Sequence, residues 1–285
     1  MTSSPPATDL YCVMGNPVAH SRSPAIHARF AELTGQRLRY ERRLVALDGF
    51  AQAVRDFMAE GGRGCNITVP FKFEAQGLAT TCSERVHLAG AANTLRFQPD
   101  GSIQADNTDG LGLVADITRN AGVPLQGARV LLVGAGGAAA GVLGPVLQAG
   151  AVHVTVANRT LAKAQALVQS HSALAALQKA ELLAQDPQAL EADFDVIINA
   201  TASSLAGAEV PVPAQVLRPG SLAYDMMYGP AAQGFLDWAR RHGAVPRDGL
   251  GMLVEQAAEA FLLWRGVRPP SGQVLAEMQA AAASA

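Results

Sequence analysis

The longest stretch of the chain without a charged side chain runs from Val130 to Asn158 and restricts the possible folds more than any other feature. A run of this length would suffice for a membrane-spanning helix. However, it contains six glycines and Pro145. Its two ends are rich in the β-branched and aliphatic residues typical of strands. We therefore predict a buried strand, helix and second strand.

A glycine-rich turn follows the first of these strands. Gly134, Gly136 and Ala139 fit the pattern G-x-G-x-x-[G/A] at the point where the strand gives way to the helix. The first glycine permits a tight turn, the second lets backbone N–H groups approach a pyrophosphate, and the small third residue lets helix and strand pack closely. We expect dinucleotide binding here, the alternative being an ordinary helix start rich in glycine and alanine. The predicted contacts are Gly134, Ala135, Gly136, Gly137 and Ala138.

The end of the second strand indicates which dinucleotide binds. NAD sites commonly place Asp or Glu there to accept from the ribose 2′-hydroxyl. This chain has Asn158, Arg159 and Thr160 instead, with Lys163 one turn further on. A carboxylate would repel a 2′-phosphate, whereas a guanidinium can bind it through two parallel hydrogen bonds. We therefore expect NADP, with a solvated helix start as the alternative explanation for the two cations.

Composition and charge argue against several other classes of protein. Hydrophobic residues make up 49% of the chain, which is enough for a packed core. The 22 Lys and Arg residues against 24 Asp and Glu leave no positive excess for a nucleic acid. The N-terminus has neither the basic start nor the apolar run of a secretory signal, so we expect a cytoplasmic protein with no membrane partner. The three cysteines and six histidines lack metal-ligand spacing, so no metal is predicted.

The order of elements indicates an α/β fold with two domains. The length of 285 residues favours two domains, and short apolar runs alternate with helical patterns as in mainly parallel sheets. Two helices expected over 251–264 and 273–283 have no strand beside them that would extend the middle sheet, so we assign them to the first domain. We predict an N-terminal α/β domain of residues 1–108 completed by 249–285. A Rossmann-type parallel-sheet domain is predicted over 109–248.

The first domain is expected to begin with a strand over residues 11–14 and a turn-rich loop. Ser23 then caps a helix that has Pro24 at its first position. Strands are expected over 38–44 and 65–69, and a helix over 50–59.

Seven motifs extend over nearly the whole chain. They are GNPVAHSRSP at 15–24, NITVPFK at 66–72, AANTL at 91–95, DNTDG at 106–110, GAGGA at 134–138, NRT at 158–160 and DGLGMLVEQAA at 248–258. Together they resemble the shikimate dehydrogenase family. The resemblance implies a substrate domain followed by an NADP domain, and NADP-dependent reduction of 3-dehydroshikimate to shikimate in aromatic amino acid biosynthesis. A monomer or homodimer is expected.

The resemblance implies that Lys72 and Asp109 are catalytic. Hydride transfer to a carbonyl needs a proton for the nascent alkoxide, which a lysine beside the oxygen can deliver. Asp109 is expected to orient the hydroxyl and Lys72, and which of the two transfers the proton stays open. The alternatives are an exposed lysine after a strand and a carboxylate that caps the helix beginning near Gly110.

The resemblance also implies the remaining contacts. The residues expected to bind the carboxylate and hydroxyls of the substrate are Ser21, Ser23, Asn66, Thr68, Asn93, Tyr228 and Gln256. Thr201, Met226 and Gly249 are expected near the ribose and nicotinamide of the cofactor. Several donors and acceptors suit a triol acid, because each unpaired polar group in a closed site costs about 1–3 kcal/mol.

Two other functions are alternatives to this one. A quinate/shikimate dehydrogenase that uses NAD would be expected to carry an acidic residue near position 158, where this chain has asparagine and then arginine. A non-catalytic dinucleotide-binding regulator on the same fold would be favoured if Lys72 or Asp109 were missing, and both are present.

Overall fold

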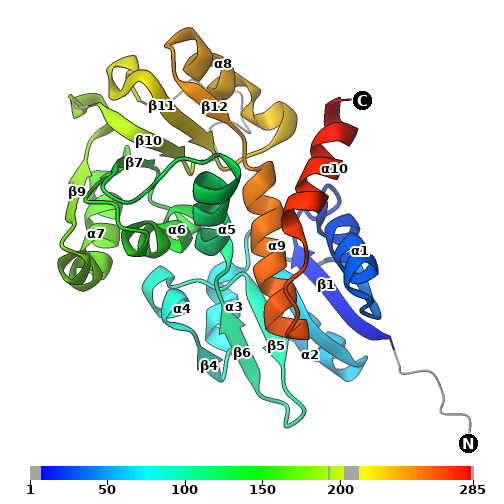
Figure 1. The fold of residues 1–285 in the computed structure, drawn as a ribbon. Coiled ribbons are helices and arrows are strands. Elements are labelled where there is room, and N and C mark those ends of the chain that lie inside the picture. Colours follow the sequence, from blue (N-terminus) through cyan, green and yellow to red (C-terminus); the bar gives the residue numbers. More distant parts are fainter. Residues whose placement is uncertain (1–7, 192, 202–211, 284–285) are drawn as a thin grey trace, which may run out of the picture. The chain divides into compact units, whose positions relative to one another are not determined.

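The computed structural model describes residues 8–191, 193–201 and 212–283. These residues divide into two compact units. Unit 1 comprises Met1–Thr108 together with Val254–Ala285, and unit 2 comprises Asp109–Leu253. The predicted α/β fold class is confirmed, and the structure contains two sheets rich in parallel strands. Figure 1 shows the elements of both units.

Unit 1 contains a mixed sheet in the order β2-β1-β3-β5-β6-β4. Its strands are β1 (Asp9–Gly15), β2 (Leu38–Leu44), β3 (Gly62–Ile67), β4 (Thr81–Cys82), β5 (Thr94–Phe97) and β6 (Ile103–Asp106). β1 pairs in parallel with β2 and β3, whereas β5 pairs antiparallel with β3 and β6. The strand predicted over 38–44 is confirmed. The one predicted over 65–69 ends at Ile67, because Phe71 N–H donates to Thr68 O at 3.1 Å and closes a turn.

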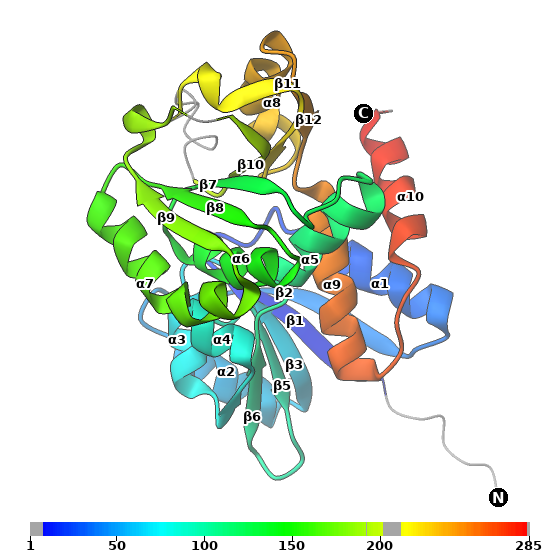
Figure 2. The same ribbon diagram turned by 60° about the vertical axis from the view of Figure 1, so that its left-hand side comes forward.

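In the part of the chain that the structure describes, six helices include residues of unit 1. They are α1 (Ser23–Thr34), α2 (Phe50–Ala59), α3 (Lys72–Leu78), α4 (Glu84–Ala89), α9 (Leu250–Arg265) and α10 (Ser271–Ala283). The prediction for 50–59 is confirmed, and those for the last two helices are confirmed to within two residues at each end. Figures 1 and 2 both show α10 beside α1, which agrees with the contacts between these helices.

The prediction that Ser23 caps α1 is wrong. Arg22 occupies the capping position without a side-chain hydrogen bond, Ser23 is the first helical residue and Pro24 the second. Ser21 lies ahead of the helix, and its Oγ accepts from the Ser23 N–H at 3.3 Å. The hydroxyl that satisfies this helix-start amide therefore belongs to Ser21.

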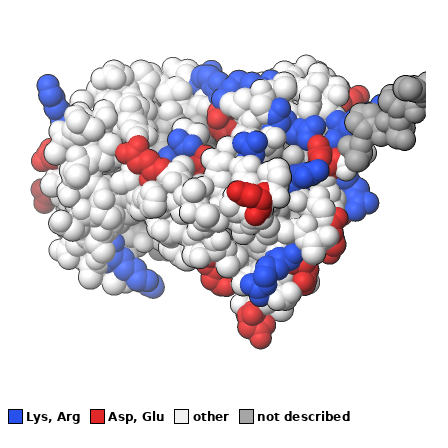
Figure 3. Space-filling model, turned by 90° about the horizontal axis from the view of Figure 1, so that it is seen from below, with Lys and Arg blue, Asp and Glu red and all other residues white. Residues whose placement is uncertain are grey.

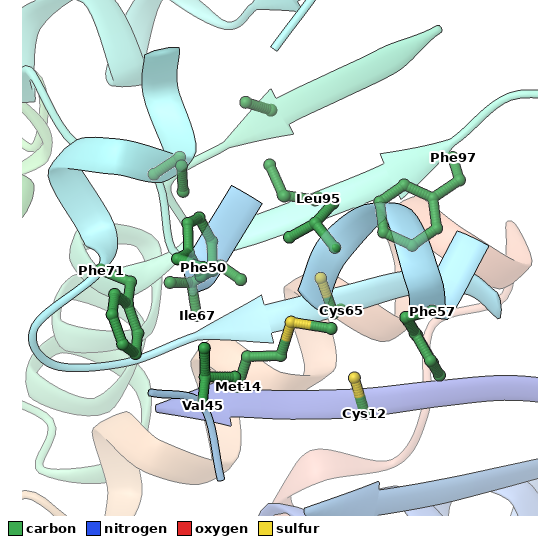
Figure 4. Close-up of a cluster of buried hydrophobic side chains, with 14 of the residues drawn as sticks. Cys12, Met14, Val45, Phe50, Phe57, Cys65, Ile67, Phe71, Leu95 and Phe97 are labelled. Atoms are coloured by element: carbon green, nitrogen blue, oxygen red, sulfur yellow. The ribbon is translucent and has the colours of Figure 1, made fainter. Parts of the chain in front are cut away.

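Successive side chains along the strands of unit 1 point to opposite faces of the sheet, and both faces are buried. On one face, Figure 4 shows apolar side chains of β1, β3 and β5 packed against aromatic side chains of α2 and the start of α3. This cluster includes Cys12, Met14, Phe50, Phe57, Cys65, Ile67, Phe71, Leu95 and Phe97. On the other face, Tyr11, Val13 and Tyr40 pack with Ala260 and Trp264 of α9. Residues of the C-terminal helix α9 thus form part of the unit 1 core.

The described residues of unit 2 form a parallel sheet in the order β12-β11-β10-β7-β8-β9. Its strands are β7 (Arg129–Val133), β8 (His153–Ala157), β9 (Glu181–Gln185), β10 (Phe194–Asn199), β11 (Leu217–Asp225) and β12 (Val245–Arg247). Figure 2 shows β7, β8 and β9 side by side. The chain runs outward from β7 in both directions, so a topological switch point lies between β7 and β10, where ligands of such sheets bind.

The helices of unit 2 connect these strands. They are α5 (Asp109–Ala115), a π-helical turn (Asp116–Asn120), α6 (Gly137–Gln148), α7 (Leu161–Gln178) and α8 (Gln233–Arg241), with 3-10 turns at Pro187–Ala189, Ala214–Val216 and Gly229–Ala232. The charge-free run forms β7, α6 and β8 as predicted. Gly110 lets α5 approach α6, because a Cβ there would fall 2.4 Å from Pro145 Cγ.

Figure 3 shows lysine and arginine side chains interspersed with acidic ones on the face that it presents. Within the described parts of the chain, no helix is both long and apolar enough to span a membrane.

Candidate active site

A connected row of buried polar side chains lies in unit 1. Its members come from β2, β3, β5, the loops before β5 and α5, and α9, and each is at most 9% exposed. They are Tyr40, Asn66, Asn93, Thr94, Thr108 and Gln256. Asn66, Asn93 and Gln256 were predicted to bind substrate, and the structure brings these three together. We call the row the asparagine network.

Asn66 is hydrogen-bonded inside this network. Its Nδ2 donates to Asn93 O at 3.2 Å and to Thr94 Oγ1 at 3.0 Å. Its Oδ1 accepts from the Tyr40 hydroxyl at 2.8 Å. Both amide hydrogens and the amide oxygen of Asn66 therefore have partners within the protein.

Asn93 connects the network to Gln256. Its Oδ1 accepts from Thr108 N–H at 2.9 Å and from the Thr94 hydroxyl at 2.8 Å. Its Nδ2 lies 3.0 Å from Thr108 Oγ1 and 3.4 Å from Gln256 Oε1. The contact with Gln256 is the longest of these, and so the weakest.

Ser21 and Thr68 lie in loops, and Ser23 begins a helix. Ser21 is half-buried, and its carbonyl oxygen accepts from Arg42 Nε and Nη2 at 2.9 and 2.6 Å. Ser23 is buried at the first position of α1. Thr68 is half-buried beside Gly15, where a Cβ would fall 2.3 Å from Thr68 Cγ2. The glycine thus makes room for the Thr68 side chain.

The two residues predicted to be catalytic belong to different units. Lys72 is the half-buried first residue of α3, and its carbonyl oxygen accepts from Ala92 N–H at 2.8 Å. This bond ties α3 to the loop that carries Asn93. Asp109 is 6% exposed and begins α5 in unit 2, directly after Thr108 of the asparagine network in the chain.

The glycine turn of unit 2 fits a pyrophosphate. Gly134 has φ +109°, which only glycine adopts readily, and a Cβ there would lie 3.2 Å from Ala200 and Thr201 atoms. Gly136 precedes α6 and is exposed, with no heavy atom within 4 Å of a Cβ built on it. Ala139 is fully buried. The start of α6 is therefore open at Gly136, where an anion can approach the helix N-terminus.

The end of β8 presents two cations. Asn158 Nδ2 donates to Thr160 O at 2.9 Å and fixes the turn into α7. Arg159, Thr160 and Lys163 are exposed. Within the described part of the chain, neither Arg159 nor Lys163 makes a side-chain hydrogen bond or ion pair. An incoming phosphate would therefore displace no existing partner of either cation.

The carboxyl ends of β10 and β11 carry a second polar group. Thr201 donates to Asn199 Oδ1 through its N–H at 3.2 Å and its hydroxyl at 2.7 Å. Asn199 Nδ2 in turn donates to Asp225 Oδ2 at 3.1 Å.

Asp248 holds the turn after Tyr228 close to the start of α9. Its carboxylate accepts from Gly229 N–H at 3.1 Å and from Leu250 N–H at 3.2 Å. Tyr228 is half-buried next to this turn, and Gly249 is buried between Asp248 and α9. Met226, also half-buried, follows β11, and its N–H donates to Asn199 O at 3.0 Å.

Several residues of these groups were missed from sequence. Thr94 and Thr108 lie inside the AANTL and DNTDG motifs, so their positions were available as signals. Asn199 and Asp225 end strands at the sheet edge where ligands bind, which is a weaker signal. Tyr40 occupies an inward position of a strand and gave no signal of a polar role.

A buried histidine lies against Tyr40. The rings of His27 and Tyr40 stack with centroids 4.2 Å apart and an interplanar angle of 6°. Burial lowers the pKa of His27 to about 3, and neither ring nitrogen has a hydrogen-bond partner among the described residues. The ring is therefore neutral. Among the described residues, no group of three or more His, Cys, Asp or Glu side chains is arranged to hold a metal ion.

Three family models match the chain. They are the shikimate dehydrogenase substrate binding domain over residues 13–95, shikimate / quinate 5-dehydrogenase over 116–210, and the shikimate 5′-dehydrogenase C-terminal domain over 249–282. The first contains the proposed substrate residues from Ser21 to Asn93, and the second contains the glycine turn.

Similar proteins cover nearly the whole chain. A relative from Verminephrobacter eiseniae, named shikimate dehydrogenase (NADP(+)), is 80% identical over 275 residues, which is 96% of each chain. An Ael1 enzyme from Pseudomonas putida has a solved structure with 48% identity and a TM-score of 0.88, covering 95% of this chain and 98% of that one. The shikimate 5-dehydrogenase of Thermus thermophilus, solved with NADP(H) and shikimate, has 31% identity and a TM-score of 0.81, covering 94% and 97%.

Proposed function

The chain belongs to the shikimate dehydrogenase family, and from that premise we propose how its residues divide the reaction between them. The chain is an oxidoreductase of the shikimate pathway that interconverts 3-dehydroshikimate and shikimate with NADP as cofactor. We propose residues 1–108 and 249–285 as the substrate domain and 109–248 as the NADP domain. We further propose that the protein acts in the cytoplasm as a monomer or homodimer.

The observation that carries the substrate assignment is the asparagine network. A triol acid offers several hydroxyls, each of which needs a donor or an acceptor in a site that excludes water. The network holds the amides of Asn93 and Gln256 in place among buried partners. We propose that Asn93, Gln256 and Thr68 bind the ring hydroxyls, and that Ser21, Ser23 and Tyr228 bind the carboxylate.

NADPH, when bound, supplies a hydride to the carbonyl carbon of 3-dehydroshikimate. The two electrons of the carbonyl π bond then move to oxygen, which takes a proton to become the hydroxyl of shikimate. We propose that the Lys72 ammonium delivers this proton and that the Asp109 carboxylate accepts a hydrogen bond that orients Lys72 and the hydroxyl. In the oxidation direction, the same groups remove the hydroxyl proton.

The cofactor contacts follow the shape of unit 2. We propose that the pyrophosphate binds at the open side of Gly136 and the N–H groups at the start of α6, since the Gly134 N–H already donates to Ala157 O at 2.8 Å. We propose that Arg159 and Lys163 bind the 2′-phosphate, with Asn158 and Thr160 shaping that turn. Thr201 would accept from a ribose hydroxyl, and Met226 and Gly249 would line the nicotinamide.

Product analysis tests this function directly. The purified protein is incubated with 3-dehydroshikimate and NADPH, and the shikimate formed is compared with the NADPH consumed. We expect a ratio of one to one, because each turnover transfers one hydride. NADPH loss without shikimate would contradict the substrate assignment. Absence of any reaction, with dinucleotide still bound, would support the non-catalytic regulator instead.

A further inference from the structure

We propose that Tyr40 and Asn66 are positioning residues that orient the amide of Asn93, so that Asn93 meets the substrate as a hydrogen-bond donor and Gln256 meets it as an acceptor. The proposal rests on the proposed function, and it moves Asn66 from substrate contact to support of a neighbour. It is carried by the direction of each hydrogen bond in the asparagine network.

The first direction is fixed by a backbone carbonyl. Asn93 O can only accept, so the Asn66 atom that lies 3.2 Å from it is the nitrogen, Nδ2. The Asn66 oxygen therefore faces Tyr40, at 2.8 Å. An amide oxygen can only accept, so the Tyr40 hydroxyl donates.

The second direction is fixed by a backbone amide. Thr108 N–H can only donate, so the Asn93 atom 2.9 Å away is the oxygen, Oδ1. The Thr94 hydroxyl accepts from Asn66 Nδ2 and donates its own hydrogen to the same Asn93 oxygen at 2.8 Å. The hydrogen bonds thus run in one direction, from Tyr40 through Asn66 and Thr94 to Asn93.

The direction of these hydrogen bonds determines which atoms of Asn93 and Gln256 a ligand contacts. The Asn93 oxygen already accepts from Thr94 and Thr108, so the face of Asn93 toward Gln256 is its NH₂ group. The 3.4 Å contact from Asn93 Nδ2 to Gln256 Oε1 is long, so a hydroxyl oxygen can replace it at low cost. One substrate hydroxyl inserted there would accept from Asn93 and donate to Gln256. A ring carbon without a hydroxyl would make neither of these two contacts.

The aromatic surroundings of Tyr40 keep its hydroxyl aligned. The His27 ring stacks on it at 4.2 Å, and Trp264 lies with its ring centroid 6.3 Å away. Tyr40 is 9% exposed, and burial raises the pKa of its hydroxyl, which therefore remains a donor. A phenylalanine would keep this packing and remove the donor alone.

Tyr40→Phe tests the proposal, with Tyr11→Phe as the matched control. Tyr11 belongs to the same aromatic cluster, but its hydroxyl lies 3.4 Å from Arg265 Nη1 and has no contact with the network. For Tyr40→Phe we expect KM for shikimate to rise about tenfold, since one hydrogen bond is lost from a buried amide. KM of this variant for NADP⁺ should stay within about twofold of the wild-type value. For Tyr11→Phe, KM for shikimate and KM for NADP⁺ should both stay within about twofold of wild type.

Substrate analogues provide a second test, because a general loss of rigidity in the site would raise KM equally for shikimate and its analogues. With 4-deoxyshikimate and 5-deoxyshikimate, the penalty of Tyr40→Phe should largely vanish for the analogue that lacks the hydroxyl bound by Asn93. An unchanged shikimate KM in Tyr40→Phe would overturn the proposal. So would equal penalties for shikimate and both analogues.

A measurement without substrate separates this proposal from the proposed function. Tyr40→Phe and Thr94→Val interrupt the same series of hydrogen bonds, so the double variant should lose less unfolding free energy than the sum of the two single losses. Strict additivity would contradict the network even if the wild-type protein oxidises shikimate. If the two substitutions are coupled in unfolding free energy but the wild-type protein does not oxidise shikimate, the network is supported and the proposed function is rejected.

Discussion

Gly249 lies directly against the backbone of Met226: a Cβ on Gly249 would fall 2.3 Å from the Met226 carbonyl oxygen. The Gly249 N–H also donates to Met227 O at 2.8 Å. The two chain segments that we propose line the nicotinamide are therefore held together by a contact that tolerates no side chain.

Gly249→Ala should displace Met226 and weaken cofactor binding. We expect Kd for NADP⁺, measured by fluorescence titration, to rise about tenfold or more, because a contact this short forces the backbone to move. Gly234→Ala in α8 is the control, since a Cβ at Gly234 meets no atom within 4 Å. Equal Kd values for both variants and wild type would exclude Gly249 from shaping this pocket.

Arg159→Ala should discriminate between the two dinucleotides. Loss of the guanidinium removes a partner of the 2′-phosphate, which NAD lacks, so KM should rise about tenfold or more for NADP⁺ and change little for NAD. Arg241→Ala, at an exposed arginine of α8, makes the same change in net charge and should leave both constants unaltered. A parallel rise for NADP⁺ and NAD would show that Arg159 does not read the 2′-phosphate.

Lys72→Ala should separate turnover from binding. Removing the proposed proton donor is expected to lower kcat about 10²- to 10⁴-fold, the range typical of general acid–base catalysis. Kd for shikimate, measured by calorimetry in the presence of NADP⁺, should change by only a few-fold, since other residues hold the hydroxyls and carboxylate. A variant with near-normal kcat would remove Lys72 from the proton transfer.

Prediction of the fold from sequence was most accurate where the backbone conformation allows only certain residue types. The turn at Gly134 needs a positive φ and close packing, so its glycines specify the local shape of the chain. The helix start at Ser23 was misassigned because the local pattern does not reveal that Ser21 reaches the Ser23 amide.

The asparagine network shows the limit of such prediction. Tyr40 is an inward residue of β2 and is joined to Asn66, on another strand, by a hydrogen bond. A tyrosine at an inward strand position is ordinary core by pattern, and its partner becomes known only when β1 brings β2 and β3 together. Roles that depend on pairing between distant strands are therefore absent from local motifs.

His27 should make folding sensitive to acid. Burial lowers its pKa from 6.5 to about 3, so the unfolded chain binds a proton before the folded protein does. Unfolding free energy should then decrease as pH falls from 6.5 toward 3, with His27 contributing about 3 kcal/mol of loss by pH 4. Urea unfolding of wild type and His27→Phe at pH 7 and pH 4 measures this loss. An equal pH dependence in the two proteins would contradict a buried neutral imidazole.

The central claim is that the protein binds both shikimate and NADP and transfers a hydride between these two ligands. The most direct measurement follows absorbance of the reduced nicotinamide with shikimate or quinate, each offered with NADP⁺ or NAD. We expect fast turnover for shikimate with NADP⁺ and a much lower kcat/KM for the other three pairings. A preference for quinate or for NAD would contradict this claim, and so would no turnover in any pairing.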